Sequence, residues 1–166
     1  MYKVNDYVVY GLTGVCRILD IGKDEYTGND ETQYYVLKPV DDNNMTIRVP
    51  VDNENILLRP IITKDEVLSL IATMPEKEII WPEDERRRSA DFKTALKSGK
   101  NEEWIKIIKT LHSEKETRAA VGKKLPKMDE AIMNTAEKHL NQEFALALGI
   151  SPEEVIPYIL DHIPEK

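Results

Sequence analysis

The sequence predicts an α+β protein, with a small antiparallel β-barrel followed by an all-helical domain. Short runs of β-branched and aromatic residues, separated by glycines and Asp/Asn clusters, fill the chain up to about Leu58. After Pro60 the apolar residues recur with the spacing of amphipathic helices. We therefore expect a β domain over residues 1–60, a helix and linker over 61–83, and a helical domain over 84–166.

Four short strands are expected in the β domain, each bounded by residues that favour turns. Glycines and the polar cluster at 41–44 supply backbone conformations that β-branched residues resist. Strands of this length and spacing are typical of a small antiparallel barrel. The expected strands span residues 7–10, 15–19, 34–37 and 45–50.

The helical part begins where Thr63 and Glu66 form the sequence pattern of a capping box. Pro75 is expected to end this first helix, and the proline-flanked residues that follow are expected to form a linker. An apolar stripe that includes Trp104 is expected to lie in the core of the bundle. Four further helical segments are expected: 85–98 with Gly99 past its end, one from an N-cap at Asn101, one from Pro126 to Gly149, and one from Ser151.

The charge is divided unevenly along the chain. Thirteen of the 23 Lys and Arg residues lie between Arg86 and Lys127, where five acids oppose them, so this window carries +8. Because the whole chain has a net charge of −7, the remainder carries −15. One basic surface on an acidic protein favours a polyanion docking at that place, and nucleic acid is the first candidate. The alternative is that these residues only solvate helix faces.

Composition argues against membrane and secreted proteins. The hydrophobic content is 41%, and no apolar run approaches the roughly 20 residues that span a bilayer. The first residues lack the apolar core of a signal peptide, and the single cysteine, Cys16, excludes an internal disulfide framework. We therefore expect a cytoplasmic protein without a membrane partner.

The sequence offers little catalytic chemistry. The histidines, His112, His139 and His162, lie one per expected helix without the ligand spacing of a zinc site. The Gly11–Gly14 segment is too short for a dinucleotide fingerprint and lacks the end of a P-loop. We therefore expect no catalytic residues, no metal, no cofactor and no enzymatic activity.

Cations are expected to line one side of the helix that begins near Glu85. Three arginines open this helix, where positive charge opposes the helix dipole, and a bound anion would remove that cost. Lysines follow at intervals of three or four, and others lie in a later connection, from which flexible ammonium groups can reach phosphates. The candidate phosphate-contacting residues are Arg86, Arg87, Arg88, Lys93, Lys97, Lys100, Lys123 and Lys124.

Trp81 is a further candidate, because it lies between a helix end and Pro82 rather than on an apolar stripe. An indole beside a basic helix can insert at a distorted base step or stack on an unpaired base. Alternatively, Trp81 packs between the β domain and the bundle.

Four segments in order carry a resemblance to a known family: Val8-Val9-Tyr10 before a glycine turn, Tyr34 to Lys38, Met45 to Pro50, and a lone tryptophan preceding a basic helical domain with Leu96-Lys97-Ser98-Gly99. The chain resembles the CarD/CdnL family of bacterial transcription regulators over essentially its whole length. The resemblance implies a Tudor-like (SH3-like) domain that binds the RNA polymerase β subunit. It also implies a helical domain that contacts promoter DNA.

The resemblance also implies roles for individual residues. Arg48 is expected to face the polymerase, with Met45 and Ile47 contributing; the alternative for Arg48 is a solvated strand residue. Trp81 matches the tryptophan that family members wedge into the minor groove at the upstream edge of the promoter bubble. This chain departs from the family pattern in two places: Pro82 to Glu85 intervene before the arginines, and Asp24-Glu25-Tyr26 does not match a basic polymerase contact.

The expected function is therefore a transcription regulator that binds polymerase and, with little sequence selectivity, double-stranded promoter DNA, and that stabilises the open complex. One alternative is a protein-only adaptor whose Tudor-like barrel binds a peptide strand without DNA contact. Another is an RNA-binding module.

Overall fold

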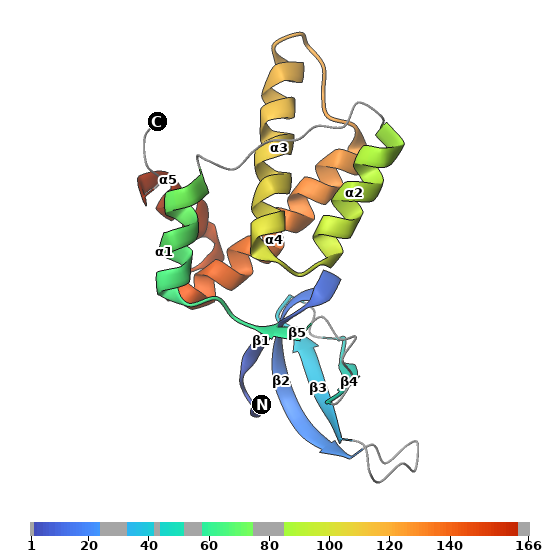
Figure 1. Cartoon of the computed structure of the whole chain (residues 1–166), viewed down its shortest axis with the longest axis vertical. Helices are drawn as coiled ribbons and strands as arrows, with labels where there is room; N and C mark the ends of the chain where they lie inside the picture. The colour runs from blue at the N-terminus through green and yellow to red at the C-terminus, as the bar shows by residue number, and fades with distance from the viewer. Residues whose placement is uncertain (1, 24–32, 42–43, 52–57, 75–84, 163–166) are drawn as a thin grey trace. The chain divides into compact units, whose positions relative to one another are not determined.

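The computed structural model describes residues 2–23, 33–41, 44–51, 58–74 and 85–162. The chain folds as two compact units, Met1–Ile61 and Ile62–Lys166. The first unit consists of strands and the second of helices, as Figure 1 shows. The predicted α+β class, a Tudor-like β domain followed by a helical domain, is confirmed.

The first unit is a five-stranded antiparallel sheet in the order β4-β3-β2-β1-β5. A 3-10 turn over Gly11–Thr13 joins the first two strands. Gly14 has a φ of 87°, in the region that favours glycine, at the point where the chain reverses into the second strand. The strands are β1 (Tyr7–Tyr10), β2 (Gly14–Lys23), β3 (Gln33–Pro39), β4 (Ile47–Pro50) and β5 (Leu58–Pro60).

Three features of this sheet differ from the strands expected from sequence. β4 begins at Ile47 rather than at residue 45. β2 is longer than the expected 15–19 segment, with a register irregularity between Ile18 and Asp20. β5 was not expected, because three residues ending in Pro60 carry almost no strand signal. β5 is specified by its pairing with β1, which is a tertiary contact.

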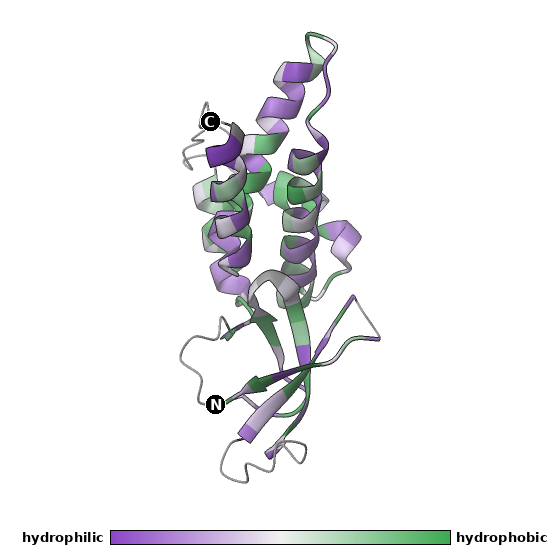
Figure 2. Ribbon diagram, turned by 90° about the vertical axis from the view of Figure 1, so that its right-hand side faces the viewer, coloured by the Kyte–Doolittle hydropathy of each residue, from purple (hydrophilic) through white to green (hydrophobic). Residues whose placement is uncertain are grey.

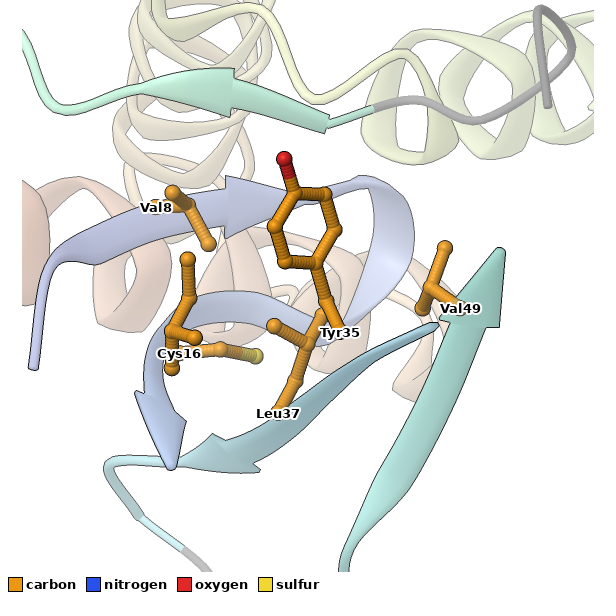
Figure 3. Close-up of a cluster of buried hydrophobic side chains, with 6 residues drawn as sticks. Val8, Cys16, Tyr35, Leu37 and Val49 are labelled. Atoms are coloured by element: carbon orange, nitrogen blue, oxygen red, sulfur yellow. The ribbon is translucent and has the colours of Figure 1, made fainter. Parts of the chain in front are cut away.

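Alternation along the strands builds the core of the β unit. Val8, Cys16, Tyr35, Leu37 and Val49 point toward one another from four strands, as Figure 3 shows, and Ile18 joins them. Burial raises the pKa of the Cys16 thiol to about 12, and the nearby charge of Asp41 adds to this effect. Cys16 is therefore a small core hydrophobe.

In the described residues the second unit contains five α-helices arranged around the longest of them, α4. α4 contacts each of the other four helices, including α1, so the helix expected within the 61–83 segment belongs to the helical unit. The helices are α1 (Lys64–Thr73), α2 (Glu85–Lys97), α3 (Asn101–Ala119), α4 (Lys127–Leu148) and α5 (Val155–His162), with a 3-10 turn over Pro152–Glu154 before α5.

The described helix ends follow the sequence signals except at the starts of α3 and α4. Pro126 was expected to open its helix but is the N-cap of α4. Pro75, the expected end of the first helix, lies outside the described residues. The Thr63–Glu66 capping box is present, and Gly149 closes α4 in the left-handed region with a φ of 71°. Asn101 was expected to be the N-cap of α3 but is its first helical residue. The N-cap position is occupied by Lys100, whose backbone is extended and whose side chain makes no cap hydrogen bond.

Trp104 and Glu143 anchor the core of the helical unit. Trp104 is fully buried, and its Nε1 donates to the carbonyl oxygen of Leu96 at 3.2 Å, which ties α3 to the end of α2. Glu143 is also fully buried, and its Oε2 accepts a hydrogen bond from the backbone N–H of Ile62 at 2.9 Å. Hydrophobic and hydrophilic residues share each of the longer helices, as Figure 2 shows, which is the pattern of an amphipathic bundle.

Candidate functional site

The exposed face of α2 carries three of the expected cations. A helix turns about 100° per residue, so Arg86, Lys93 and Lys97 project within about 40° of one another. All three side chains are exposed. The small residue Ala90 lies between them on this face and leaves it open. Of the cations expected to form a positive stripe on α2, these three therefore share one exposed face.

Arg88 does not belong to that stripe. It lies about 200° around the helix from Arg86 and is only 4% exposed. Its Nη2 donates to Oδ2 of Asp129 at 2.8 Å in a buried ion pair between α2 and α4. The expectation that Arg88 contacts phosphate is therefore wrong for this structure. Its spacing to the buried Phe92 and Leu96, at four and eight residues, was the sequence signal of an inward position.

The buried ion pair brings the first turns of α2 and α4 together. Arg88 lies in the first turn of α2, and Asp129 lies in the first turn of α4. Figure 1 shows the two helices beginning side by side. The N-terminus of a helix carries a partial positive charge, and exposed cations open α2 or precede and open α4. Both kinds of positive charge attract phosphate. These cations are Arg86, Arg87, Lys123, Lys124 and Lys127.

The remaining lysines of the basic window differ in what they contact. Lys100 is exposed at the N-cap of α3. Lys106 pairs with Glu103 at 3.2 Å on the exposed surface of α3. The half-buried Lys109 donates to the backbone carbonyl of Met74. Lys106 and Lys109 therefore make contacts within the helical unit.

The three residues expected to bind polymerase lie in and beside β4, at one end of the strand order. Arg48 is exposed and pairs across the sheet with Val36, while its neighbour Val49 is buried. Met45 is 41% exposed just before the strand. Ile47 instead packs partly against the core of the β unit. Arg48 and Met45 therefore present more surface to a partner than Ile47 does.

Trp81 lies outside the described residues, so its role stays a prediction.

The three histidines each contact a different residue: His112 pairs with Glu137 at 2.6 Å, His139 packs against Trp104, and His162 stacks on Tyr158. In the described part of the chain no three or more His, Cys, Asp or Glu side chains are grouped to hold a metal ion. No helix among the described residues is long and apolar enough to cross a bilayer.

Comparison with known protein families gives two matches. A model described as the CarD-like/TRCF RID domain matches residues 2–62, and a model described as the CarD C-terminal domain matches residues 68–160. A search of curated proteins found no match. The two family matches follow the order of the sheet unit and the helical unit.

Proposed function

Because the chain belongs to the CarD/CdnL family, whose members are transcription-related proteins that interact with RNA polymerase, we propose that it binds the polymerase β subunit through β4 and promoter DNA through its helical unit. The domains of this family are non-catalytic regulators. We therefore propose that the protein acts by binding alone, without a cofactor. We also propose that it acts in the cytoplasm.

The geometry of β4 supports the polymerase contact. An edge strand presents backbone N–H and C=O groups that a partner strand can pair with. Arg48 projects from this strand on the exposed face, where a guanidinium group can add a charge-assisted hydrogen bond to a carboxylate. Met45 adds apolar contact area beside it.

The single observation that carries the DNA contact is the shared exposed face of Arg86, Lys93 and Lys97 on α2. Their spacing along the helix allows contact with several phosphates of one strand. Phosphate contacts position a protein on DNA but do not read its sequence. We therefore propose that polymerase brings the protein to promoters and that its affinity for free DNA is low.

Trp81 precedes α2 by a few residues in the sequence. We propose that its indole wedges into the minor groove at the upstream edge of the bubble. A wedge that unstacks and kinks the duplex there opposes reannealing of the strands and so stabilises the open complex.

Measurement of polymerase binding by the full-length protein tests the first contact. Arg48→Glu reverses a charge on the exposed face and is expected to weaken binding to the β subunit about tenfold or more. Lys3→Glu also reverses a positive charge, at an exposed position of the same unit outside β4, and is the matched control. Equal affinity of the Arg48→Glu variant and the wild type would remove Arg48 from the interface.

The lifetime of promoter open complexes after addition of a competitor tests the second contact. The wild type is expected to extend this lifetime, and a Lys93→Gln/Lys97→Gln variant is expected to extend it less. Lys64→Gln, an exposed lysine of α1, is the control. A protein-only adaptor would bind polymerase with wild-type affinity and leave the lifetime unchanged in every variant.

A further inference from the structure

Three polar side chains form a row across the exposed face of the sheet. Tyr7 of β1 is the cross-strand partner of Arg17 of β2, and Arg17 is the partner of Lys38 of β3. Tyr7 and Arg17 are exposed, and Lys38 is half-buried. Directly paired residues of antiparallel strands project on the same face with Cβ atoms about 5 Å apart. The row therefore places two cations and a phenol side by side.

A cavity of about 220 Å³ lies at this row. It is lined by Tyr7, Arg17, Lys38, Pro39 and Val40. The backbone N–H of Val40 donates to the carbonyl oxygen of Val15 at 3.1 Å, which holds the far wall against β2. The cavity therefore rests on paired backbone, and the charged side chains of Arg17 and Lys38 are part of its lining.

The two cations lie directly opposite each other on neighbouring strands. Among the described residues neither Arg17 nor Lys38 forms an ion pair or a side-chain hydrogen bond. Like charges directly opposite each other on neighbouring strands destabilise a sheet. An anion bound between them would convert this repulsion into two charge-assisted contacts. The repulsion between Arg17 and Lys38 therefore destabilises the sheet, and a bound anion would remove this destabilisation.

We propose that this cavity, the Tyr7–Arg17–Lys38 pocket, receives an Asp or Glu side chain of a protein partner. The two cations contact the carboxylate oxygens, the Tyr7 hydroxyl donates a further hydrogen bond, and Val40 covers the apolar stem of the incoming side chain. The pocket faces the same side of the sheet as Arg48, because Lys38 and Val36 are two residues apart on β3 and Val36 pairs with Arg48. The inference rests on the proposed function, since it takes RNA polymerase as the partner.

The charge of the β unit favours a single carboxylate over a nucleic acid. Residues 1–61 contain six Lys and Arg against ten Asp and Glu, so the unit carries −4. A field of this sign repels a polyanion at long range, whereas two adjacent cations attract one carboxylate at short range. The basic window that suits phosphate lies instead in the helical unit.

Zero-length cross-linking identifies the occupant directly. A carbodiimide joins a lysine amine to a carboxylate in contact with it as an amide, with loss of water. In a complex of the full-length protein with RNA polymerase, mass spectrometry is expected to find Nζ of Lys38 joined to an Asp or Glu of polymerase. Lys38→Arg keeps the charge and is expected to abolish this product. Absence of any polymerase adduct at Lys38 would overturn the proposal.

Affinity for polymerase provides the second measurement. Arg17→Glu and Lys38→Glu are each expected to raise the dissociation constant about tenfold, and Lys3→Glu is expected to leave it unchanged. Circular dichroism checks that each variant is folded, and the milder Arg17→Gln and Lys38→Gln are expected to shift affinity in the same direction. Wild-type affinity in all four pocket variants would refute the pocket.

The outcomes separate this proposal from the one it rests on. If Arg48→Glu loses polymerase while the pocket variants retain it, the pocket is refuted and the polymerase contact through β4 stands. If the pocket variants lose polymerase while Arg48→Glu retains it, the pocket stands and Arg48 is refuted. If the pocket variants weaken binding to DNA alone and not to polymerase, the occupant is a phosphate and the proposal is wrong.

Discussion

Nη2 of Arg88 lies 2.8 Å from Oδ2 of Asp129, and both side chains are almost completely buried. This ion pair joins α2 to α4. It gives Arg88 a structural role that differs from that of its neighbours Arg86 and Arg87. Arg86 and Arg87 remain exposed, whereas Arg88 holds the helix that carries them. The ion pair of Arg88 with Asp129 therefore helps to fix the orientation of α2, and with it the direction in which the exposed cations of α2 point.

Loss of Asp129 is expected to destabilise the helical unit strongly. Asp129→Ala leaves the buried guanidinium of Arg88 without its charge partner, and removing one member of a buried pair costs about 3–5 kcal/mol. The free energy of unfolding from urea denaturation measures this change. Arg87→Ala, an exposed position one residue away, is the control and is expected to stay within about 0.5 kcal/mol of the wild type. Similar values for the two variants would show that the pair has no structural role.

Glu143 is expected to hold the start of the helical unit through Ile62. Glu143→Ala removes the acceptor of a buried backbone N–H, a loss that costs about 1–3 kcal/mol. Hydrogen exchange of the Ile62 amide is expected to become faster in this variant. Glu143→Gln keeps an acceptor oxygen at the same position and is expected to retain more of the protection. Unchanged exchange in Glu143→Ala would contradict the assigned contact.

Cys16 is expected to make the stability of the protein depend on alkaline pH. Burial raises the pKa of its thiol from an ordinary value of 9.0 to about 12, so the folded state keeps a proton that the unfolded state has lost. The contribution of the thiol to stability is therefore complete below about pH 9 and is lost as the pH rises toward 12.

The unfolding free energy at pH 8 and pH 10.5 measures this dependence. The wild type is expected to lose more stability between the two values than Cys16→Ala, because alanine has no proton to release. Equal losses would show that the thiol titrates normally in the folded protein.

The salt dependence of DNA binding is expected to report the cations on α2. Each phosphate contact contributes about 0.9 to the slope of log affinity against log salt concentration. A variant with Arg86→Gln, Lys93→Gln and Lys97→Gln is therefore expected to reduce the magnitude of the slope by about 2–3. Lys64→Gln on α1 is the control and is expected to leave the slope unchanged. A triple variant with the wild-type slope would place the DNA contact elsewhere.

Much of the architecture could be predicted from local sequence signals. The Thr63–Glu66 capping box, the glycine stop at Gly149 and the core position of Trp104 all follow from patterns within a few residues. The strand β5 could not be predicted this way, because it is three residues long and is specified by its pairing with β1. Local patterns identify an element when the element is long enough to show its period.

The candidate site was less accessible to sequence reasoning. A run of three arginines in the sequence suggested one basic group, but helical rotation sends Arg88 to the opposite side from Arg86. The cation pair of Arg17 and Lys38 could not be predicted from the sequence, because the two residues are far apart along the chain and become neighbours through the register of β2 against β3. Charge counts identify a basic region, whereas pairing and rotation decide which cations act together.

Hydroxyl-radical footprinting of a polymerase–promoter complex with the full-length protein tests the central claim most directly. The account predicts protection at the upstream edge of the bubble that disappears in Trp81→Ala, while polymerase binding by that variant remains at the wild-type level. Protection that is the same for wild type and Trp81→Ala, or absent with both, would contradict it.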